Sequence, residues 1–118
     1  MKDNIIKDKS FNFAVRVVNM CKYLHNEKKE YILSKQLLRS GTSIGANISE
    51  AEHAQSADDF VYKLNIALRE ANETEYWLKL LLHTEYLTTE QHDSINNDCK
   101  ELNKILISII KTTRNKKQ

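Results

Sequence analysis

The segment Glu50-Ala-Glu-His53 contains the residues whose types and spacing come closest to a metal site. In helical bundles, a Glu-x-x-His pair binds a di-metal centre when a second such pair and carboxylates from facing helices complete the site. The chain has no second Glu-x-x-His, so Glu70 and Glu73 would have to supply the missing carboxylates. If the chain turns back near residue 55, Glu50 faces Val61, about 13 Å short of Glu70. We therefore expect no metal site.

Other reactive residues are equally isolated. The sequence contains no P-loop, no Gly-rich phosphate loop and no arrangement of a nucleophile beside a base. Its two cysteines, Cys21 and Cys99, lie at apolar-periodic positions in separate segments and form no Cys-x-x-Cys pair. Buried free thiols are the expected state for both. The sequence predicts neither an enzyme nor a bound cofactor.

One segment, Arg39-Ser-Gly-Thr-Ser-Ile-Gly-Ala-Asn-Ile-Ser-Glu-Ala51, is poor in helix-forming residues although it lies inside a helical pattern. It holds the only two glycines of the chain, each costing about 1 kcal/mol relative to alanine in a helix interior. Their spacing of four places them on one side of the helix, which predicts close contact with a neighbouring helix. An alternative is a ligand or nucleic-acid surface, lined by Arg39, Ser43, Asn47 and Glu50.

Hydrophobic periodicity predicts an all-α fold in a single domain, residues 1–118. The expected helices cover about residues 10–25, 30–54, 57–86 and 89–113. Ser10 is a candidate N-cap, and capping boxes begin at Ser56 and Thr88. Short connections favour an antiparallel up-down-up-down four-helix bundle. The predicted core comprises Phe11, Val18, Ile44, Ile48, Leu64, Ala71, Leu78, Leu102, Leu106 and Ile109. No apolar run reaches the ~18 residues of a membrane span.

The segment 57–86 has more apolar surface than one core needs. Ile66, Trp77 and Leu80 form a second stripe about a third of a turn from the first. This stripe predicts self-association, although a wide core face would also explain it. Arg39 is expected level with Glu70 and Glu73, where its guanidinium can pair with a carboxylate within the bundle or across a subunit contact.

Charge is distributed unevenly along the chain. Residues 1–49 hold nine Lys/Arg and four Asp/Glu, residues 50–101 hold four and twelve, and residues 102–118 hold five and none. An antiparallel bundle brings both termini to one end, where the basic residues form a candidate phosphate-binding patch. Solvated ends without a ligand are the alternative. The candidate contacts are Lys2, Lys7, Lys9, Lys111, Arg114, Lys116 and Lys117.

Two segments resemble a known family. Leu37-Leu-Arg-Ser-Gly-Thr-Ser-Ile-Gly-Ala-Asn-Ile-Ser-Glu-Ala51 and Asp59-Phe-Val-Tyr-Lys-Leu-Asn-Ile-Ala-Leu-Arg-Glu-Ala-Asn-Glu-Thr-Glu-Tyr-Trp-Leu78 are similar to signatures of bacterial four-helix-bundle proteins encoded in intervening sequences of 23S rRNA genes. The resemblance implies a homopentamer. It also implies kinship with accessory proteins of diversity-generating retroelements, which bind nucleic acid and a reverse transcriptase. The residues matching the family pattern, with implied structural or interface roles, are Arg39, Ser43, Asn47, Glu50, Glu70, Glu73 and Trp77.

Three functions are compatible with the sequence. The first is an oligomeric protein associated with RNA or DNA, favoured by the resemblance and the basic termini. The second is a structural or protein-interaction scaffold without nucleic-acid contact, favoured by the near-neutral net charge of +2. The third, an enzyme or metal carrier, depends only on Glu50 and His53. The first nine residues contain no apolar signal core, so a cytoplasmic protein is expected.

Overall fold

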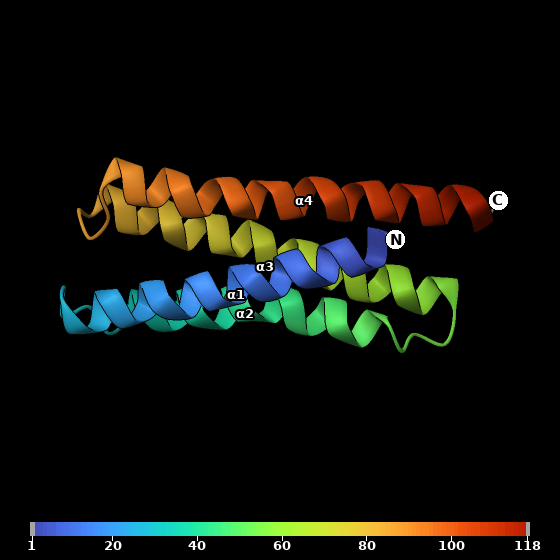
Figure 1. Ribbon diagram of the computed structural model, residues 1–118, viewed down its shortest axis with the longest axis horizontal. Helices are drawn as coiled ribbons and strands as arrows, with labels where there is room; N and C mark the ends of the chain where they lie inside the picture. The colour runs from blue at the N-terminus through green and yellow to red at the C-terminus, as the bar shows by residue number, and fades with distance from the viewer. Residues whose placement is uncertain (1, 118) are drawn as a thin grey trace.

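Four helices and three short connections make up the fold. The computed structural model describes the backbone of residues 2–117 and the side chains of residues 5–116. The helices are α1 (Lys2–Asn26), α2 (Leu33–Ala51), α3 (Ala57–His83) and α4 (Thr89–Lys117). Figure 1 shows that the chain reverses direction along the long axis at each connection. The bundle measures 49 × 21 × 20 Å between its Cα extents.

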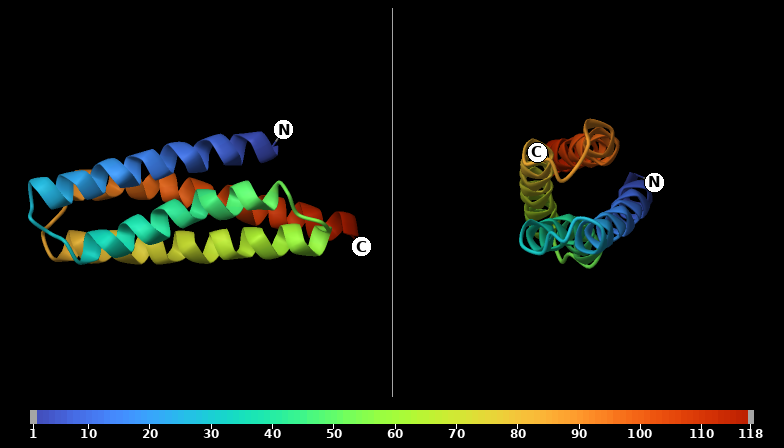
Figure 2. Two further views of the ribbon diagram at one scale, coloured as in Figure 1. Left: turned by 90° about the horizontal axis from the view of Figure 1, so that it is seen from below. Right: turned by 90° about the vertical axis from the view of Figure 1, so that its left-hand side faces the viewer.

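Each helix contacts two others. α2 packs on α1 and α3, and α4 packs on α3 and α1, so α1 lies diagonally from α3 and α2 from α4. The contact between α1 and α4 is the least extensive of the four. The end view in Figure 2 shows this side as the widest separation between neighbouring helices. None of the helices within residues 2–117 combines the length and apolar character that a membrane span requires.

The predicted core is correct for α2, α3 and α4 but wrong for α1. Phe11 is 68% exposed and Val18 is only half-buried. The helix instead buries Phe13, Val17 and Leu24. Both sets of α1 residues recur at helical spacing, and periodicity alone does not show which stripe turns inward. The correctly predicted residues are buried: Ile44, Ile48, Leu64, Ala71, Leu78, Leu102, Leu106 and Ile109.

The predicted capping box at Thr88 is confirmed, whereas at Ser56 only the N-cap half of the predicted box forms, because the Asp59 carboxylate accepts the backbone N–H of Gln55 instead. Ser56 Oγ accepts the backbone N–H of Asp59 at 3.0 Å, at the start of α3. Before α4, Thr88 and Gln91 form a reciprocal pair, in which each side chain accepts the backbone N–H of the other, at 3.1 and 2.9 Å. These bonds satisfy N–H groups that have no partner inside a helix.

Other helix ends differ from the prediction. α1 already runs from Lys2, and Ser10 is buried inside it, its hydroxyl donating to the carbonyl of Lys7 at 3.0 Å. A serine can bond back to an earlier carbonyl as well as cap, so its position in the sequence did not locate the helix start. α3 ends at His83, since Glu85 has a left-handed φ of 69°. α4 continues to Lys117.

Glu30 determines where α2 begins. Its carboxylate accepts the backbone N–H groups of Ile32, Leu33 and Ser34 at 3.0, 2.9 and 2.7 Å. Glu30 therefore precedes α2 and caps it, and the helix starts at Leu33 rather than at residue 30. Burial disfavours the charged carboxylate, but the three N–H donors outweigh burial and lower the pKa of Glu30.

The glycines of α2 admit α1 closely, as their spacing predicts. A Cβ at position 41 would lie 2.7 and 2.8 Å from the two methyl groups of Val17, which is fully buried. A Cβ at position 45 would lie 3.3 Å from the carbonyl oxygen of Ser10. Valine is stiff about χ1, so Val17 cannot move aside at Gly41 without repacking.

We expect Gly41→Ala to lower the free energy of unfolding. Overpacking costs about 1–3 kcal/mol, against the roughly 1 kcal/mol that alanine gains over glycine in a helix. Gly45→Ala is the matched control, because its added methyl group needs a shift of only a few tenths of an ångström. Urea denaturation measures both; equal stability of the two variants would contradict the assigned contact.

We expect Glu30→Ala to cost roughly 1.5–3 kcal/mol at neutral pH, because the start of α2 loses its charged acceptor. Because the folded-state pKa is lowered from 4.5, this contribution is full above pH 4.5 and is lost as pH falls through the folded-state pKa. Denaturation of Glu30→Ala and the parent protein across pH measures the difference. The exposed Glu27→Ala serves as control, and a difference independent of pH would argue against the capping role.

Candidate functional site

The residues that match the two sequence signatures gather along the outer edge of the contact between α2 and α3. Inside this contact, the two helices are joined by a hydrogen bond of 3.0 Å between the buried hydroxyls of Thr74 and Ser40. Nearby, Lys63 lies 3.6 Å from a carboxylate oxygen of Glu50. The signature residues on this edge are Arg39, Ser43, Asn47 and Glu50 from α2, and Glu70, Glu73 and Trp77 from α3.

Most polar groups on this edge bond within their own helix. Ser43 Oγ donates to the carbonyl of Arg39 at 2.7 Å, and Asn47 Nδ2 donates to the carbonyl of Ser43 at 2.8 Å. The indole N–H of Trp77 donates to Glu73 at 3.0 Å. These internal bonds support a structural role and leave few groups free to hold a ligand.

The predicted ion pair of Arg39 is not formed within the described chain. Burial and the neighbouring Glu73 carboxylate raise the pKa of Glu70, and the charges of Arg39 and Arg69 oppose that rise. Arg39 therefore lies near enough to act on Glu70, but no ion pair within 4 Å joins it to Glu70 or Glu73.

The residues considered for metal chemistry are separated in space. Glu50 pairs with Lys63, and His53 is exposed. Among the described side chains, no three His, Cys, Asp or Glu groups lie where they could hold a metal ion together. Cys99 is buried as predicted, whereas Cys21 is only half-buried. Burial raises the pKa of the two thiols, to about 11 for Cys21 and about 12 for Cys99, so neither is an activated nucleophile.

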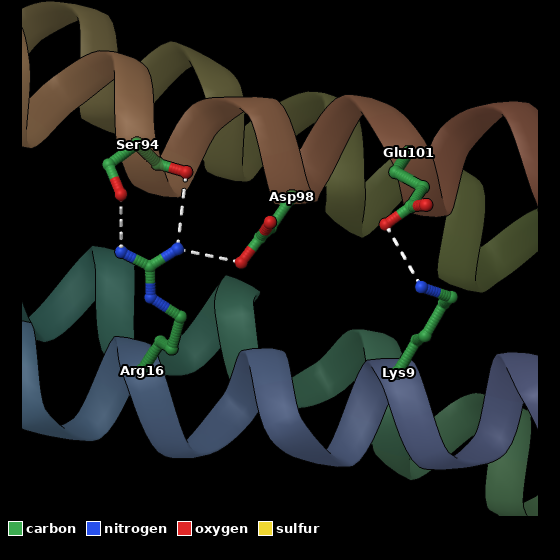
Figure 3. A network of polar contacts seen from close by, with 5 residues as sticks. All are labelled: Lys9, Arg16, Ser94, Asp98 and Glu101. Atoms are coloured by element: carbon green, nitrogen blue, oxygen red, sulfur yellow. Dashed lines mark hydrogen bonds and ion pairs between the residues drawn. The ribbon is translucent and has the colours of Figure 1, made fainter.

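A polar network joins α1 to α4, and sequence reasoning missed it (Figure 3). The guanidinium of Arg16 donates to the carbonyl and hydroxyl oxygens of Ser94 at 3.1 and 2.8 Å, and to Asp98 at 2.6 Å. One end of the same seam is closed by Lys9 and Glu101, 3.3 Å apart. Opposite charges on helices expected to be neighbours were the only available signal, and they do not identify partners.

The predicted basic contacts divide into two groups. Both termini lie near one end of the bundle (Figure 1), but Lys7 pairs with Glu52 at 2.9 Å and Lys9 with Glu101. Lys111, Arg114 and Lys116 are exposed and form no ion pair with the described residues. The side chains of Lys2 and Lys117 lie outside the described part. Among the described predicted contacts, the unpaired positive charge therefore lies on α4.

Part of the outer surface of α1 and α2 is apolar. Two grooves of about 550 and 450 Å³ follow the contact between these helices. Phe11 and Val18 of α1, which were predicted to face the core, lie beside these grooves; Phe11 is exposed and Val18 is half-buried. We define the α1–α2 outer face by the side chains of Phe11, Ala14, Val15, Val18, Leu38 and Ala46.

By contrast, the second apolar stripe of α3 is partly covered within the chain. Ile66, Trp77 and Leu80 are half-buried, and Trp77 packs against the core. Its indole also meets the ring of Tyr76 edge-on, with centroids 5.1 Å apart. The wide core face considered in the sequence therefore accounts for part of this stripe.

These features define a class of all-helical bundle proteins. Residues 2–108 match the family model of the 23S rRNA-intervening sequence protein, and the chain belongs to that family. It is also similar to a crystal structure from Bacteroides thetaiotaomicron VPI-5482, described as a protein with unknown function from the S23 ribosomal protein family. The sequences are 71% identical, with a TM-score of 0.93, covering 94% of this chain and 99% of that one. No curated protein matches.

Proposed function

We propose that this protein is a non-enzymatic, self-associating bundle that binds RNA in the bacterial cytoplasm. The observation that carries the proposal is the separation of its two unpartnered surfaces. Exposed apolar side chains lie on α1 and α2, and unpaired basic side chains lie on α4. Because α2 and α4 are diagonal in the bundle, assembly through the first surface leaves the second free.

The assembly part of the proposal is a homopentamer of antiparallel up-down-up-down bundles. The alternating direction of the helices in Figure 1 supports this topology, and the family resemblance supports the number five. A monomer would leave Phe11, Val15 and Leu38 in water side by side, and apolar patches of this kind mark interaction sites. The edge with Trp77 and Arg39 is a second contact surface for the same assembly.

The nucleic-acid part of the proposal is supported by charge. Residues 102–118 contain five Lys/Arg and no Asp/Glu. In an assembly of several chains, the positive charges of these segments add. A surface that binds phosphate weakly in one chain then binds it more tightly through multivalency. The kinship with retroelement accessory proteins that the sequence resemblance implies makes a reverse transcriptase a further partner to test. A scaffold without nucleic-acid contact is the alternative, and the apolar surface alone would suffice for it.

We expect Phe11→Ser to weaken assembly without unfolding the chain, because this ring is 68% exposed in the single bundle. Light scattering should give a mass several times 13.8 kDa for the parent protein and a lower mass for the variant. Trp77→Ala tests the α3 stripe in the same way, and Ala46→Ser is a mild control on the same face. A parent protein that remains monomeric at all concentrations would refute the assembly.

We expect a chain ending at Ile110 to lose RNA binding, because it lacks Lys111, Arg114 and Lys116. Binding of the full chain should weaken steeply with salt, as counterion release requires. Fluorescence anisotropy with a labelled RNA measures both effects, and light scattering checks that the shortened chain still assembles. If the full chain assembles but binds no RNA or DNA even at low salt, the scaffold function replaces this proposal.

A further inference from the structure

Two stripes, exposed except at the half-buried Asn65, lie beside each other on α3 and α4. The α3 stripe recurs at steps of three and four and contains aromatic, basic and amide side chains but no carboxylate. Its members are Tyr62, Asn65, Arg69, Asn72, Tyr76, Lys79 and His83. The α4 stripe also recurs at steps of three and four and consists of Lys100, Lys104, Ile107, Lys111 and Arg114. We name the two stripes together the α3–α4 outer face.

The contact between α3 and α4 places both stripes on the same side of the bundle. Asn103 donates to Glu75 at 2.8 Å across the two helices, and Cys99 donates to the carbonyl of Ala71 at 3.4 Å. Around the circumference of each helix, Glu75 on α3 and Asn103 on α4 lie between the core positions and the exposed stripe. The helices run in opposite directions (Figure 1), so Tyr76 lies near the Lys100 end of α4 and Tyr62 near the Lys111 end.

The basic side chains of the α4 stripe form no ion pair with the described residues. Lys100, Lys104, Lys111 and Arg114 are all exposed. On α3, the charge of Arg69 acts on Glu70. The nearest carboxylates on α4 are engaged elsewhere, since Glu101 pairs with Lys9 across the α1 seam. Glu75 is held by Asn103 and Glu73 by the indole of Trp77, while Asp58 and Asp93 lie near the two ends of the face. The α4 stripe therefore presents positive charge that no ion pair compensates within the described residues.

Two tyrosine side chains on this face are exposed to solvent. Tyr62 is 62% exposed and Tyr76 is 58% exposed, whereas a tyrosine in a closed core would be covered. They are separated by two heptads, about 21 Å along the helix axis, with Arg69 midway. A phenol ring that keeps one face in water beside lysines can stack on a nucleobase while the lysines neutralise phosphates.

We propose that the α3–α4 outer face binds single-stranded nucleic acid, with Tyr62 and Tyr76 stacking on bases and the α4 lysines contacting the phosphate backbone. This inference rests on the nucleic-acid part of the proposed function and adds the surface, the strandedness and the mode of contact. A duplex buries its base faces, so only a single strand can use both the rings and the charges. The contact is tolerant of sequence, because every base offers a face for stacking.

The test measures binding to the protein by fluorescence anisotropy of a fluorescein-labelled 20-nucleotide oligouridine. A 20-nucleotide oligothymidine and a 20-base-pair RNA duplex serve as further probes. We expect the single strands to bind more tightly than the duplex. Comparison of the RNA and DNA strands shows whether the sugar contributes. Tyr62→Ala and Tyr76→Ala should each weaken single-strand binding about tenfold. Tyr62→Phe and Tyr76→Phe keep the ring and should bind like the parent protein.

A charge-reversed pair tests the lysines separately. Lys104→Glu with Lys111→Glu should weaken binding by roughly tenfold or more and reduce its salt dependence. Lys28→Glu with Lys35→Glu makes the same change in net charge on the far side of the bundle and should have a much smaller effect. Tyr31→Ala is the matched aromatic control, because Tyr31 is exposed away from this face. Light scattering and circular dichroism verify that every variant folds and assembles.

The outcomes separate this inference from the proposed function. If oligouridine binds but the alanine variants bind equally well, or if the duplex binds more tightly, this inference is wrong and RNA association stands. If no nucleic acid binds at low salt, both fail. If an acidic polypeptide such as polyglutamate binds this face and no nucleic acid does, the partner is a protein and the inference is overturned.

Discussion

The structure depends on how closely α1 approaches α2 at Gly41. The missing side chain leaves room for the methyl groups of Val17, and this contact fixes the rotation of α1 about its own axis. With Val17 inward, Phe13 and Leu24 enter the core. The same rotation turns Phe11 to the outside and directs Arg16 towards α4. A single steric constraint thus determines which apolar stripe stabilises the fold and which remains for an external partner.

Each side of the bundle consequently has a different chemistry. The α2–α3 edge is polar and bonds largely within itself, and the α1–α2 outer face is apolar. The α1–α4 seam is held by exposed ion pairs, which contribute little individually, in the range of about 0–1 kcal/mol. The hydrogen bonds of Arg16 to Ser94 add geometric specificity and fix how α1 lies on α4. Along the α3–α4 side, the basic residues of α4 form no ion pair with the described residues.

Sequence reasoning located what depends on local pattern. The four helices, the N-caps at Ser56 and Thr88, and the inner stripes of α2, α3 and α4 follow from periodicity and local hydrogen bonding. The contact made by the glycines also followed from their spacing. The start of α2 did not, because Glu30 caps it from a position that resembles the first residue of a helix.

What the sequence could not determine was set by contacts between helices. Two stripes of α1 are equally periodic, and the space at Gly41 favours the stripe that contains Val17. The partners of Arg16 and Lys9 lie about eighty to ninety residues away in the sequence, so local pattern does not identify them. The residues of the two signatures were expected on neighbouring helices, and the structure brings them to one edge. The hydrogen bonds that these side chains form within their own helices were not predicted from the sequence.

The net charge of +2 gives little indication of how this molecule meets a charged partner. Positive charges of α1 are neutralised by ion pairs, because Lys7, Lys9 and Arg16 are paired with carboxylates of other segments. Acidic residues of the middle segment are therefore partly neutralised by the N-terminal helix, and the charge of α4 is left uncompensated. At physiological salt, charges act over a Debye length of about 8 Å, which is less than the width of the bundle. A ligand at the α3–α4 outer face is therefore affected mainly by the lysines beside it, and the acidic residues on the far side are screened.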